Sequence, residues 1–214
     1  MQPQFSRRVE GSILEQKLAK PECIGVHLAK RIGNRSVVEL CSCIGVALIQ
    51  IAKSTNKTVT GVDINEDLVR KANKNAEIYG VKNVTFVVGD ATNEELLKTL
   101  KADVVIIDPH WSVSKTLSRD FANTLESTQP PADLLVSLVR KYITQNIVVQ
   151  LPPNMSDEEI QKLGKCEIES VYVNGDIKDK TVYLGDLVKS EKSKASFEYE
   201  KVEVPEEMRN IHFS

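Results

Sequence analysis

Four short segments, each following an apolar and β-branched run, contain the side chains best suited to chemistry. They are Glu39–Gly45, Val62–Ile64, Gly89–Ala91 and Asp108–Trp111. If the runs are parallel strands of an open sheet, ligands bind beyond their carboxyl ends, and the four segments should meet at one edge. The sequence therefore predicts a single ligand site built from the ends of four strands.

Two of these segments suit the nucleoside part of a ligand. Asp63, followed by Ile64, can accept hydrogen bonds from both hydroxyls of a ribose. Asp90, followed by Ala91, is placed to accept from the amino group of an adenine. Acids after strands are also common helix caps, so the alternative is that Asp63 only caps the helix that follows it.

The segment after the first strand is a turn whose backbone must approach a ligand closely. Gly45 permits this approach, and free N–H groups of a helix starting near Ile44 would face a carboxylate of the ligand. Glu39 opens the segment, and Cys41 and Cys43 stand where two glycines are typical. Small side chains can replace glycine there only if the backbone avoids positive φ. We interpret the two cysteines as small residues filling tight space beneath the loop, with a redox role as the alternative.

The fourth segment has the parts needed to hold a planar base and its amino group. The carboxylate of Asp108 and adjacent carbonyls can accept the N–H hydrogens, Pro109 makes the turn rigid, and Trp111 can stack on the ring. An aromatic amine is a poor nucleophile, so catalysis should come mainly from alignment and electrostatics. His110 could line the pocket or help bind phosphate. The alternative for Trp111 is a place in the core.

The elements that position these segments alternate β-branched runs with amphipathic stretches, as βαβ units do. We predict strands at Ser36–Cys41, Thr58–Asp63, Val84–Val88, Ala102–Asp108, Asn146–Leu151, Cys166–Val173 and Thr181–Leu184. No helix pattern separates the last two strands, so an antiparallel hairpin should end a mostly parallel sheet. This α/β order, with helices on both faces, is typical of the Rossmann-like sheet of class I methyltransferases.

Several helix starts are marked in the sequence. Capping boxes are expected at Ser12–Glu15, Thr92–Glu95 and Ser156–Glu159. Pro21 fits the first turn of a helix that runs to about Arg31. Longer amphipathic helices are expected at Ile44–Lys53, Glu66–Tyr79 and Ala132–Thr144.

Composition favours one cytoplasmic domain over a membrane or metal protein. The chain has 214 residues, of which 41% are hydrophobic and 27% charged. No apolar run approaches the roughly 20 residues that cross a bilayer, and no signal-peptide pattern opens the chain. The four cysteines lack a CxxC spacing and there are three histidines, so we expect no metal site.

Charge is unevenly distributed along the chain. The net charge of −2 argues against a protein that coats nucleic acid by bulk electrostatics. In the first 35 residues, however, seven basic side chains outnumber three acidic ones; the basic ones are Arg7, Arg8, Lys17, Lys20, Lys30, Arg31 and Arg35. This segment could be an arm that faces phosphates, or a helical extension with solvated charges.

Longer strings of the sequence resemble the trimethylguanosine synthase family, the RNA cap guanine-N2 methyltransferases. The resemblance extends from about Ser6 to Leu187 and includes Val37–Gly45, Asn73–Gly80, Ala102–Trp111, Asn146–Asn154 and Tyr183–Asp186. It implies transfer of a methyl group from S-adenosylmethionine to the N2 amine of a guanine in RNA. The size of the chain suggests a compact prokaryotic relative, with a tRNA, an rRNA or a small RNA as partner.

The order and composition of the chain suggest three parts, and the resemblance adds to the site. Residues 1–34 would be a helical extension, 35–188 the S-adenosylmethionine-dependent domain, and 189–214 a tail that is partly loose. Trp111 matches the family tryptophan that stacks on a methylated guanine, and Asn154 of the Leu-Pro-Pro-Asn string would contact the substrate. The family motif reads Ser-Pro-Pro-Trp, so Asp108 and His110 depart from it. Adenine N6 or a protein side chain therefore remains an alternative acceptor, and so does a non-catalytic RNA-binding role.

Overall fold

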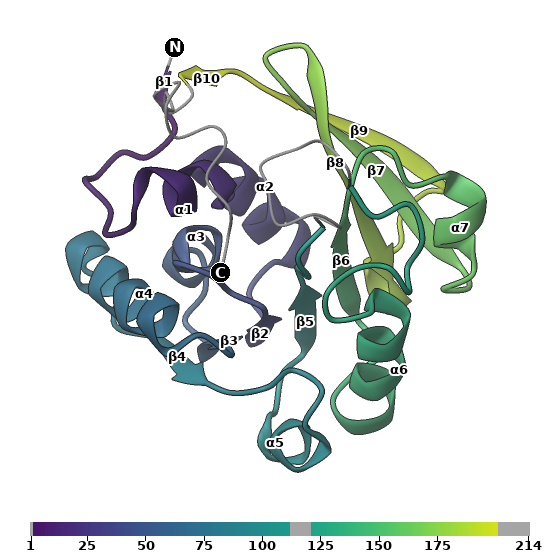
Figure 1. Ribbon diagram of the computed structural model, residues 1–214, viewed down its shortest axis with the longest axis horizontal. Coiled ribbons are helices and arrows are strands. Elements are labelled where there is room, and N and C mark those ends of the chain that lie inside the picture. Colours follow the sequence, from purple (N-terminus) through teal and green to yellow (C-terminus); the bar gives the residue numbers. More distant parts are fainter. Residues whose placement is uncertain (1, 112–120, 201–214) are drawn as a thin grey trace.

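An eight-stranded sheet runs through the computed structural model, which describes residues 2–111 and 121–200 (Figure 1). The strand order is β4-β3-β2-β5-β6-β8-β7-β9. The strands are β2 (Val37–Leu40), β3 (Val59–Asp63), β4 (Val84–Val88), β5 (Val104–Ile107), β6 (Ile147–Leu151), β7 (Cys166–Val173), β8 (Asp176–Leu184) and β9 (Lys192–Phe197). Strand β8 is antiparallel to both of its neighbours, and the other pairs are parallel. The predicted mostly parallel α/β sheet with an antiparallel hairpin is confirmed.

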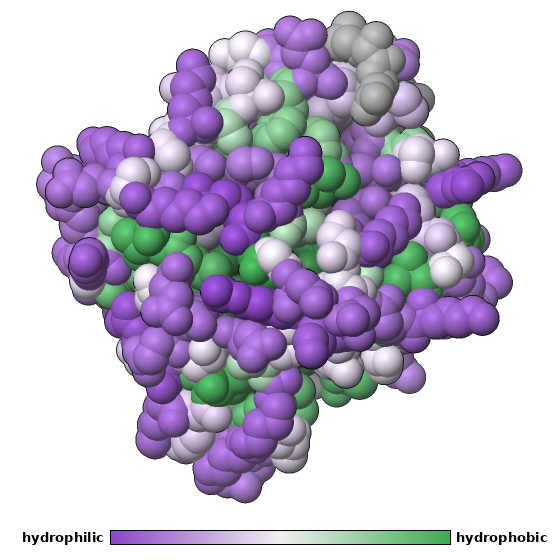
Figure 2. Space-filling model, turned by 180° about the vertical axis from the view of Figure 1, so that it is seen from behind, coloured by the Kyte–Doolittle hydropathy of each residue, from purple (hydrophilic) through white to green (hydrophobic). Residues whose placement is uncertain are grey.

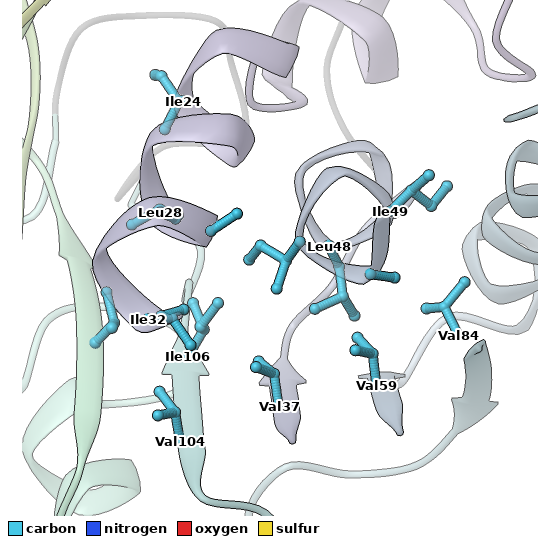
Figure 3. Close-up of a cluster of buried hydrophobic side chains, with 14 of the residues drawn as sticks. Ile24, Leu28, Ile32, Val37, Leu48, Ile49, Val59, Val84, Val104 and Ile106 are labelled. Atoms are coloured by element: carbon cyan, nitrogen blue, oxygen red, sulfur yellow. The ribbon is translucent and has the colours of Figure 1, made fainter. Parts of the chain in front are cut away.

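Helices cover both faces of this sheet. Helices α2 (Glu22–Ile32), α3 (Val46–Lys53) and α4 (Glu66–Tyr79) pack on one face, and α5 (Glu94–Thr99), α6 (Ala132–Tyr142) and α7 (Asp157–Gln161) on the other. Figure 3 shows part of the first core, where apolar side chains of α2 and α3 lie over Val37, Val59, Val104 and Ile106 of the strands. Burial of these continuous apolar strands holds the strand ends in a fixed register.

Local capping chemistry explains where most helices begin. Ser12 caps α1 (Ile13–Leu18) with the complete capping box that the sequence predicts, and the Ser156 hydroxyl caps α7. Helix α5 is capped by Asn93 rather than by Thr92, so that expected box is wrong by one residue. The amide oxygen of asparagine reaches the N–H groups two and three residues ahead, and it takes the cap here.

The end of the described chain is more ordered than its composition suggests. We expected part of the tail from Lys189 to be loose, but β9 pairs in parallel with β7 over six residue pairs. A further pair of short strands, β1 (Gln2–Pro3) and β10 (Tyr199–Glu200), joins the beginning of the described chain to its end. Residues 201–214 of the tail lie outside the described residues. A charged edge strand carries little periodic apolar signal, so its pairing could not be read from the sequence.

Polar side chains dominate one face of the molecule (Figure 2). The face seen in Figure 2 is largely hydrophilic, with hydrophobic side chains showing between the charged ones. Among the described residues, no helix has the length and apolar character required to span a membrane. The same part of the chain holds no group of histidine, cysteine and acidic side chains that could bind a metal ion.

Candidate functional site

The register of the sheet brings the four predicted segments to one edge. Leu40 of β2 lies opposite Ile107 of β5, and Asp63 of β3 lies opposite Val88 of β4. The loops after these strands therefore emerge side by side at the carboxyl edge of the parallel strands.

Asp63 ties two of these loops together at the end of β3. One carboxylate oxygen accepts the N–H of Cys43 at 2.8 Å, and the other accepts the N–H of Asn65 at 3.0 Å. The cap of α4 is Asn65, whose side chain accepts the N–H groups of Asp67 and Leu68. The alternative in which Asp63 caps this helix is therefore wrong. Its carboxylate holds the loop after β2 in place.

The neighbouring residues divide into exposed and buried ones. Ile64 is 71% exposed, which leaves an apolar surface next to Asp63. Asp90 is exposed too, and hydrogen bonds from the hydroxyl and the N–H of Thr92 lower the pKa of its carboxyl. Ala91 is only 6% exposed and belongs to the core packed against α6. Ala91 is thus placed beneath the site rather than on its surface.

The glycine-poor loop adopts the backbone that its sequence should avoid. Cys41 has φ of 66° and Cys43 has φ of 50°, so the condition under which small side chains replace glycine without strain is not met. Such a conformation costs a side-chain-bearing residue about 1–2 kcal/mol. Burial raises the pKa of the Cys41 thiol and raises that of Cys43 to about 12. A thiol that stays protonated is a poor nucleophile, so packing rather than redox chemistry is the better interpretation.

Gly45 is required for packing as well as for its backbone conformation. It precedes α3 with φ of 75°, and an added Cβ would lie 2.4 Å from the ring of Phe86 and 3.1 Å from Cβ of Ala72. The hydroxyl of Ser42 in the same loop is buried and has no hydrogen-bond partner among the described residues. The loop thus presents a buried polar atom that is unused within the described chain.

The fourth segment meets a lysine from the N-terminal part of the chain. The Nζ atom of Lys20 lies 3.8 Å from a carboxylate oxygen of Asp108 and 4.2 Å from the ring centroid of Trp111. It also donates a hydrogen bond to Asp179 on β8 at 3.3 Å. Lys20 is 6% exposed, so an ammonium group is buried between two carboxylates and an aromatic ring. An ammonium over a ring face is attracted by the electrons of that face.

Charges around Lys20 are not balanced. Burial raises the pKa of Asp108 to about 6, against the effect of Lys20. Burial, with repulsion from Asp108, also raises the pKa of Glu39 well above its ordinary value. Burial works to lower the pKa of Lys20, but Asp108 and Asp179 outweigh it and raise the pKa, which keeps the ammonium charged. Three acids, of which Glu39 and Asp179 are buried and Asp108 is partly exposed, thus share the charge of Lys20.

The remaining predicted residues lie around Trp111. Its indole N–H donates to the backbone oxygen of Gln150 at 3.1 Å, and its ring meets Phe121 edge to face at 6.1 Å. Asn154 is exposed, and its side chain donates to the backbone oxygen of Phe121 at 3.3 Å. His110 is exposed and pairs through its backbone with Gln129, while Pro109 is buried.

A small cavity joins the two halves of the site. Its volume is about 30 Å³, and it is lined by Leu18, Ala19, Lys20, Glu39, Ser42, Cys43, Ile44, Gly45, Val46, Ala47 and Asp108. One wall is therefore the connection between α1 and α2, and the other is the loop after β2. This cavity brings Glu39 and Asp108 together with the loop that holds Gly45.

Sequence reasoning missed Lys20 and Asp179. Lys20 was grouped with the basic residues of a phosphate-facing arm, but both Lys20 and Arg31 point inward, so that hypothesis is wrong for these two. The signal that could have revealed Asp179 is an acid at an inward position of β8, because buried acids are rarely found without a partner.

Comparisons with known proteins find similarity to methyltransferases. Residues 33–201 match a family described as "Methyltransferase domain". An "Uncharacterized RNA methyltransferase" of Enterococcus faecalis is 33% identical over 148 residues, which are 65% of this chain and 31% of the relative. A "tRNA (guanine(10)-N2)-dimethyltransferase" of Pyrococcus abyssi is 41% identical over 63 residues, 29% of this chain and 19% of the relative. The chain thus spans a third or less of the length of these curated relatives.

Solved structures share the fold. The crystal structure of a "putative methyltransferase" from Porphyromonas gingivalis W83 matches with a TM-score of 0.67 at 16% identity. The match covers 82% of this chain and 43% of the Porphyromonas chain. A "SAM dependent methyltransferase" from Aquifex aeolicus matches with a TM-score of 0.55 at 13% identity. This match covers 82% of this chain and 99% of the Aquifex chain. At these identities the likeness concerns the arrangement of helices and strands.

Proposed function

The chain belongs to the methyltransferase domain family, whose methyl donor is S-adenosylmethionine, and from this premise we propose that it methylates the exocyclic N2 amine of a guanine in RNA. One observation carries the proposal. Asp108 and Trp111 are brought together, through Lys20, beside the cavity that borders the loop after β2. The names of the relatives from Enterococcus faecalis and Pyrococcus abyssi support RNA as the substrate class.

The residues at the strand ends fit this methyl donor. Asp63 would hold the ribose, Ile64 would pack against the adenine, and Asp90 would accept from its amino group. The unused hydroxyl of Ser42 suits the polar end of the methionine tail. The cavity next to it has room for roughly one or two water molecules, so residues 18–20 must shift to admit that tail. When bound, S-adenosylmethionine supplies an electrophilic methyl group.

The acceptor amine becomes reactive because the protein holds it in the correct orientation relative to the methyl group. The lone pair of a guanine amine is delocalised into the ring, so the nitrogen must be held with that lone pair directed at the methyl group. The carboxylate of Asp108 accepts an N–H of the amine and fixes its orientation, while Trp111 stacks on the base. After transfer the nitrogen must lose a proton. Asp108, whose pKa is raised to about 6, can take this proton at its carboxylate and release it at neutral pH.

Labelled methyl transfer tests the proposal directly. The protein is incubated with radiolabelled S-adenosylmethionine and total cellular RNA, and the RNA is digested to nucleosides. We expect label in N2-methylguanosine. Trp111→Ala should lower the transfer rate by about 100-fold, because the base is no longer held in place, whereas Trp111→Phe keeps an aromatic platform and part of the rate. Label in N6-methyladenosine, or in protein alone, contradicts the guanine assignment.

A second candidate is an RNA-binding protein that does not catalyse transfer. The small cavity and the strained Cys41 and Cys43 favour it. Calorimetric titration with S-adenosylmethionine and S-adenosylhomocysteine separates the two candidates. Micromolar binding supports the methyltransferase, and an absence of binding supports the non-catalytic protein.

A further inference from the structure

Lys20 occupies the layer in which an acceptor base would stack. It lies between Ala19, which ends α1, and Pro21, which begins α2. Its Nζ atom is 4.2 Å above the ring of Trp111, and atoms in stacked contact are separated by about 3.5–4.0 Å. A base that stacks on this face of Trp111 would therefore have Nζ beside its edge once the flexible lysine stem moves aside.

This corner of the fold contains polar groups that the described chain does not use. A lysine ammonium has three N–H donors, and among the described residues Nζ makes one hydrogen bond, to Asp179. Both amide atoms of Gln150 are buried and lack a hydrogen-bond partner in the same part of the chain. Gln150 belongs to β6, where it lies opposite Thr181 of β8. Its backbone oxygen accepts the indole N–H of Trp111. Unpartnered buried polar atoms cost free energy unless a ligand or water satisfies them.

Asp179 is held firmly in this arrangement. It is fully buried, and its second carboxylate oxygen accepts the hydroxyl of Thr181 at 3.1 Å. Lys20 thus lies between two carboxylates, that of Asp108 directly after β5 and that of Asp179 on β8. The corner offers one positively charged donor and two negatively charged acceptors.

We propose that Lys20 determines acceptor specificity by donating a hydrogen bond to a ring carbonyl oxygen, while Asp108 and Asp179 accept from the N–H groups next to it. The proposal rests on the function proposed above. The pairing edge of guanine carries a carbonyl oxygen followed by two N–H positions, which complements one donor and two acceptors. Adenine offers an amine and a bare ring nitrogen there, and the lone pair of that nitrogen would face a carboxylate. Lys20 acts as a positioning residue, because the transferred methyl goes to the neighbouring amine.

Two purine nucleotides that differ at the carbonyl position and at the ring nitrogen next to it test this role, with Lys20 variants isolating the part due to the carbonyl. Guanosine monophosphate has the oxygen, and 2-aminoadenosine monophosphate keeps the 2-amine but has an amine in place of the oxygen. The chain has a single tryptophan, so quenching of Trp111 fluorescence reports stacking of either nucleotide. We expect the wild type to bind the guanine nucleotide at least about 10-fold more tightly, as for a hydrogen bond to a charged group.

Substitution of Lys20 should weaken this preference. Lys20→Met keeps the length of the side chain but has no donor, so the preference for the guanine nucleotide should fall several-fold, and only the part due to the ring N–H facing a carboxylate should remain. Lys20→Arg should retain part of the preference. Lys17→Met, at an exposed lysine of α1, is the matched control and should bind as the wild type does. The double variant Lys20→Met/Asp179→Asn removes one positive and one negative charge together, and its thermal melt checks that loss of preference is not loss of folding.

The outcomes separate this inference from the proposed function. If Lys20→Met and the double variant keep the preference of the wild type, the role of Lys20 is overturned, even where N2-methylguanosine forms in RNA. If the wild type binds both nucleotides equally or binds neither, the inference fails as well. Absence of methylated guanine in the labelling experiment overturns the proposed function itself.

Discussion

Two clusters of buried charges lie where the N-terminal segment meets the sheet, and they are built in opposite ways. In the first, Lys20 is 3.3 Å from Asp179 and 3.8 Å from Asp108, so its contacts are few and long. In the second, Arg31 of α2 donates two hydrogen bonds, of 2.9 and 2.8 Å, to Glu167. Both cations come from the segment for which the sequence left open a phosphate-facing arm or a helical extension with solvated charges.

The second cluster has more and shorter hydrogen bonds, although Nε of Arg31 has no partner among the described residues. The guanidinium of Arg31 lies 3.9 Å from the ring centroid of Tyr183, whose hydroxyl donates to Glu169. Burial works to raise the pKa of Glu167, but hydrogen bonds from Arg31 and Ser193 outweigh it and lower the pKa to about 2. In the Lys20 cluster burial prevails, and the pKa of Asp108 rises to about 6.

The difference separates a stabilising cluster from a binding one. A buried ion pair offsets its desolvation only with short, multiple hydrogen bonds, and the Arg31 cluster has them. The Lys20 cluster lacks them, and it borders the cavity at the strand ends. Perturbed carboxylates beside a cavity are typical of sites where a ligand completes the interactions.

The largest expected effect on the free energy of unfolding comes from a substitution that breaks the Arg31 cluster. Arg31→Met leaves Glu167 buried without its partner and should lower the free energy of unfolding by about 3–5 kcal/mol. Lys30→Met, at the exposed neighbouring position, should change it by less than about 0.5 kcal/mol. Urea denaturation measures both variants. Equal stability of the two would show that the Arg31 cluster does not stabilise the fold.

A smaller effect on stability is expected when a glutamate is replaced by glutamine in each of the two clusters. Glu169→Gln weakens the charged partner of Tyr183 and His27 and should cost about 1–3 kcal/mol. Glu39→Gln removes a surplus charge, since burial and Asp108 already disfavour the ionised form of Glu39. It should therefore cost nothing or stabilise by up to about 1 kcal/mol. Urea denaturation at neutral pH gives both values, and a loss of similar size in the two variants would refute the contrast.

The smallest effect is the dependence of stability on pH. The pKa of Asp108 in the folded protein, about 6, lies above its ordinary value, so the folded state gains stability from this group as the pH falls from 7 to 5. Asp108→Asn should abolish that gain, which is on the order of 1 kcal/mol. Glu167 has a pKa lowered to about 2, so its contribution is lost only as the pH falls below about 4.5.

Urea denaturation at pH 7, 6 and 5 checks this prediction. Wild type and Asp108→Asn should differ in unfolding free energy by an amount that changes over this range, whereas the difference between wild type and Glu167→Gln should stay constant. A constant difference for Asp108→Asn would show that its carboxyl titrates normally. Methyl transfer should also fall below pH 6, because a protonated Asp108 no longer accepts the amine N–H.

Local patterns in the sequence were sufficient for most of the fold. Period-2 and period-3.6 apolar spacing predicted β4, β7 and α4 with the bounds that the structure has, and the lack of a helix after β7 predicted the hairpin. The rule that ligands bind beyond parallel strands placed Asp63, Ile64, Asp90 and Asp108 at one edge, although their roles in binding stay predictions. These features depend on neighbouring residues and on the repeat of the backbone.

Contacts between distant residues decided the rest. Lys20 and Asp179 are 159 positions apart, and no local pattern links them. Whether Cys41 and Cys43 adopt positive φ depends on how Asp63 holds their loop, and β9 is a strand because β7 offers it an edge. The sequence by itself determined which residues form strands and helices, because propensity and periodicity are local. The tertiary structure decided which charges are buried together, because burial and pairing energies depend on residues that only folding brings into contact.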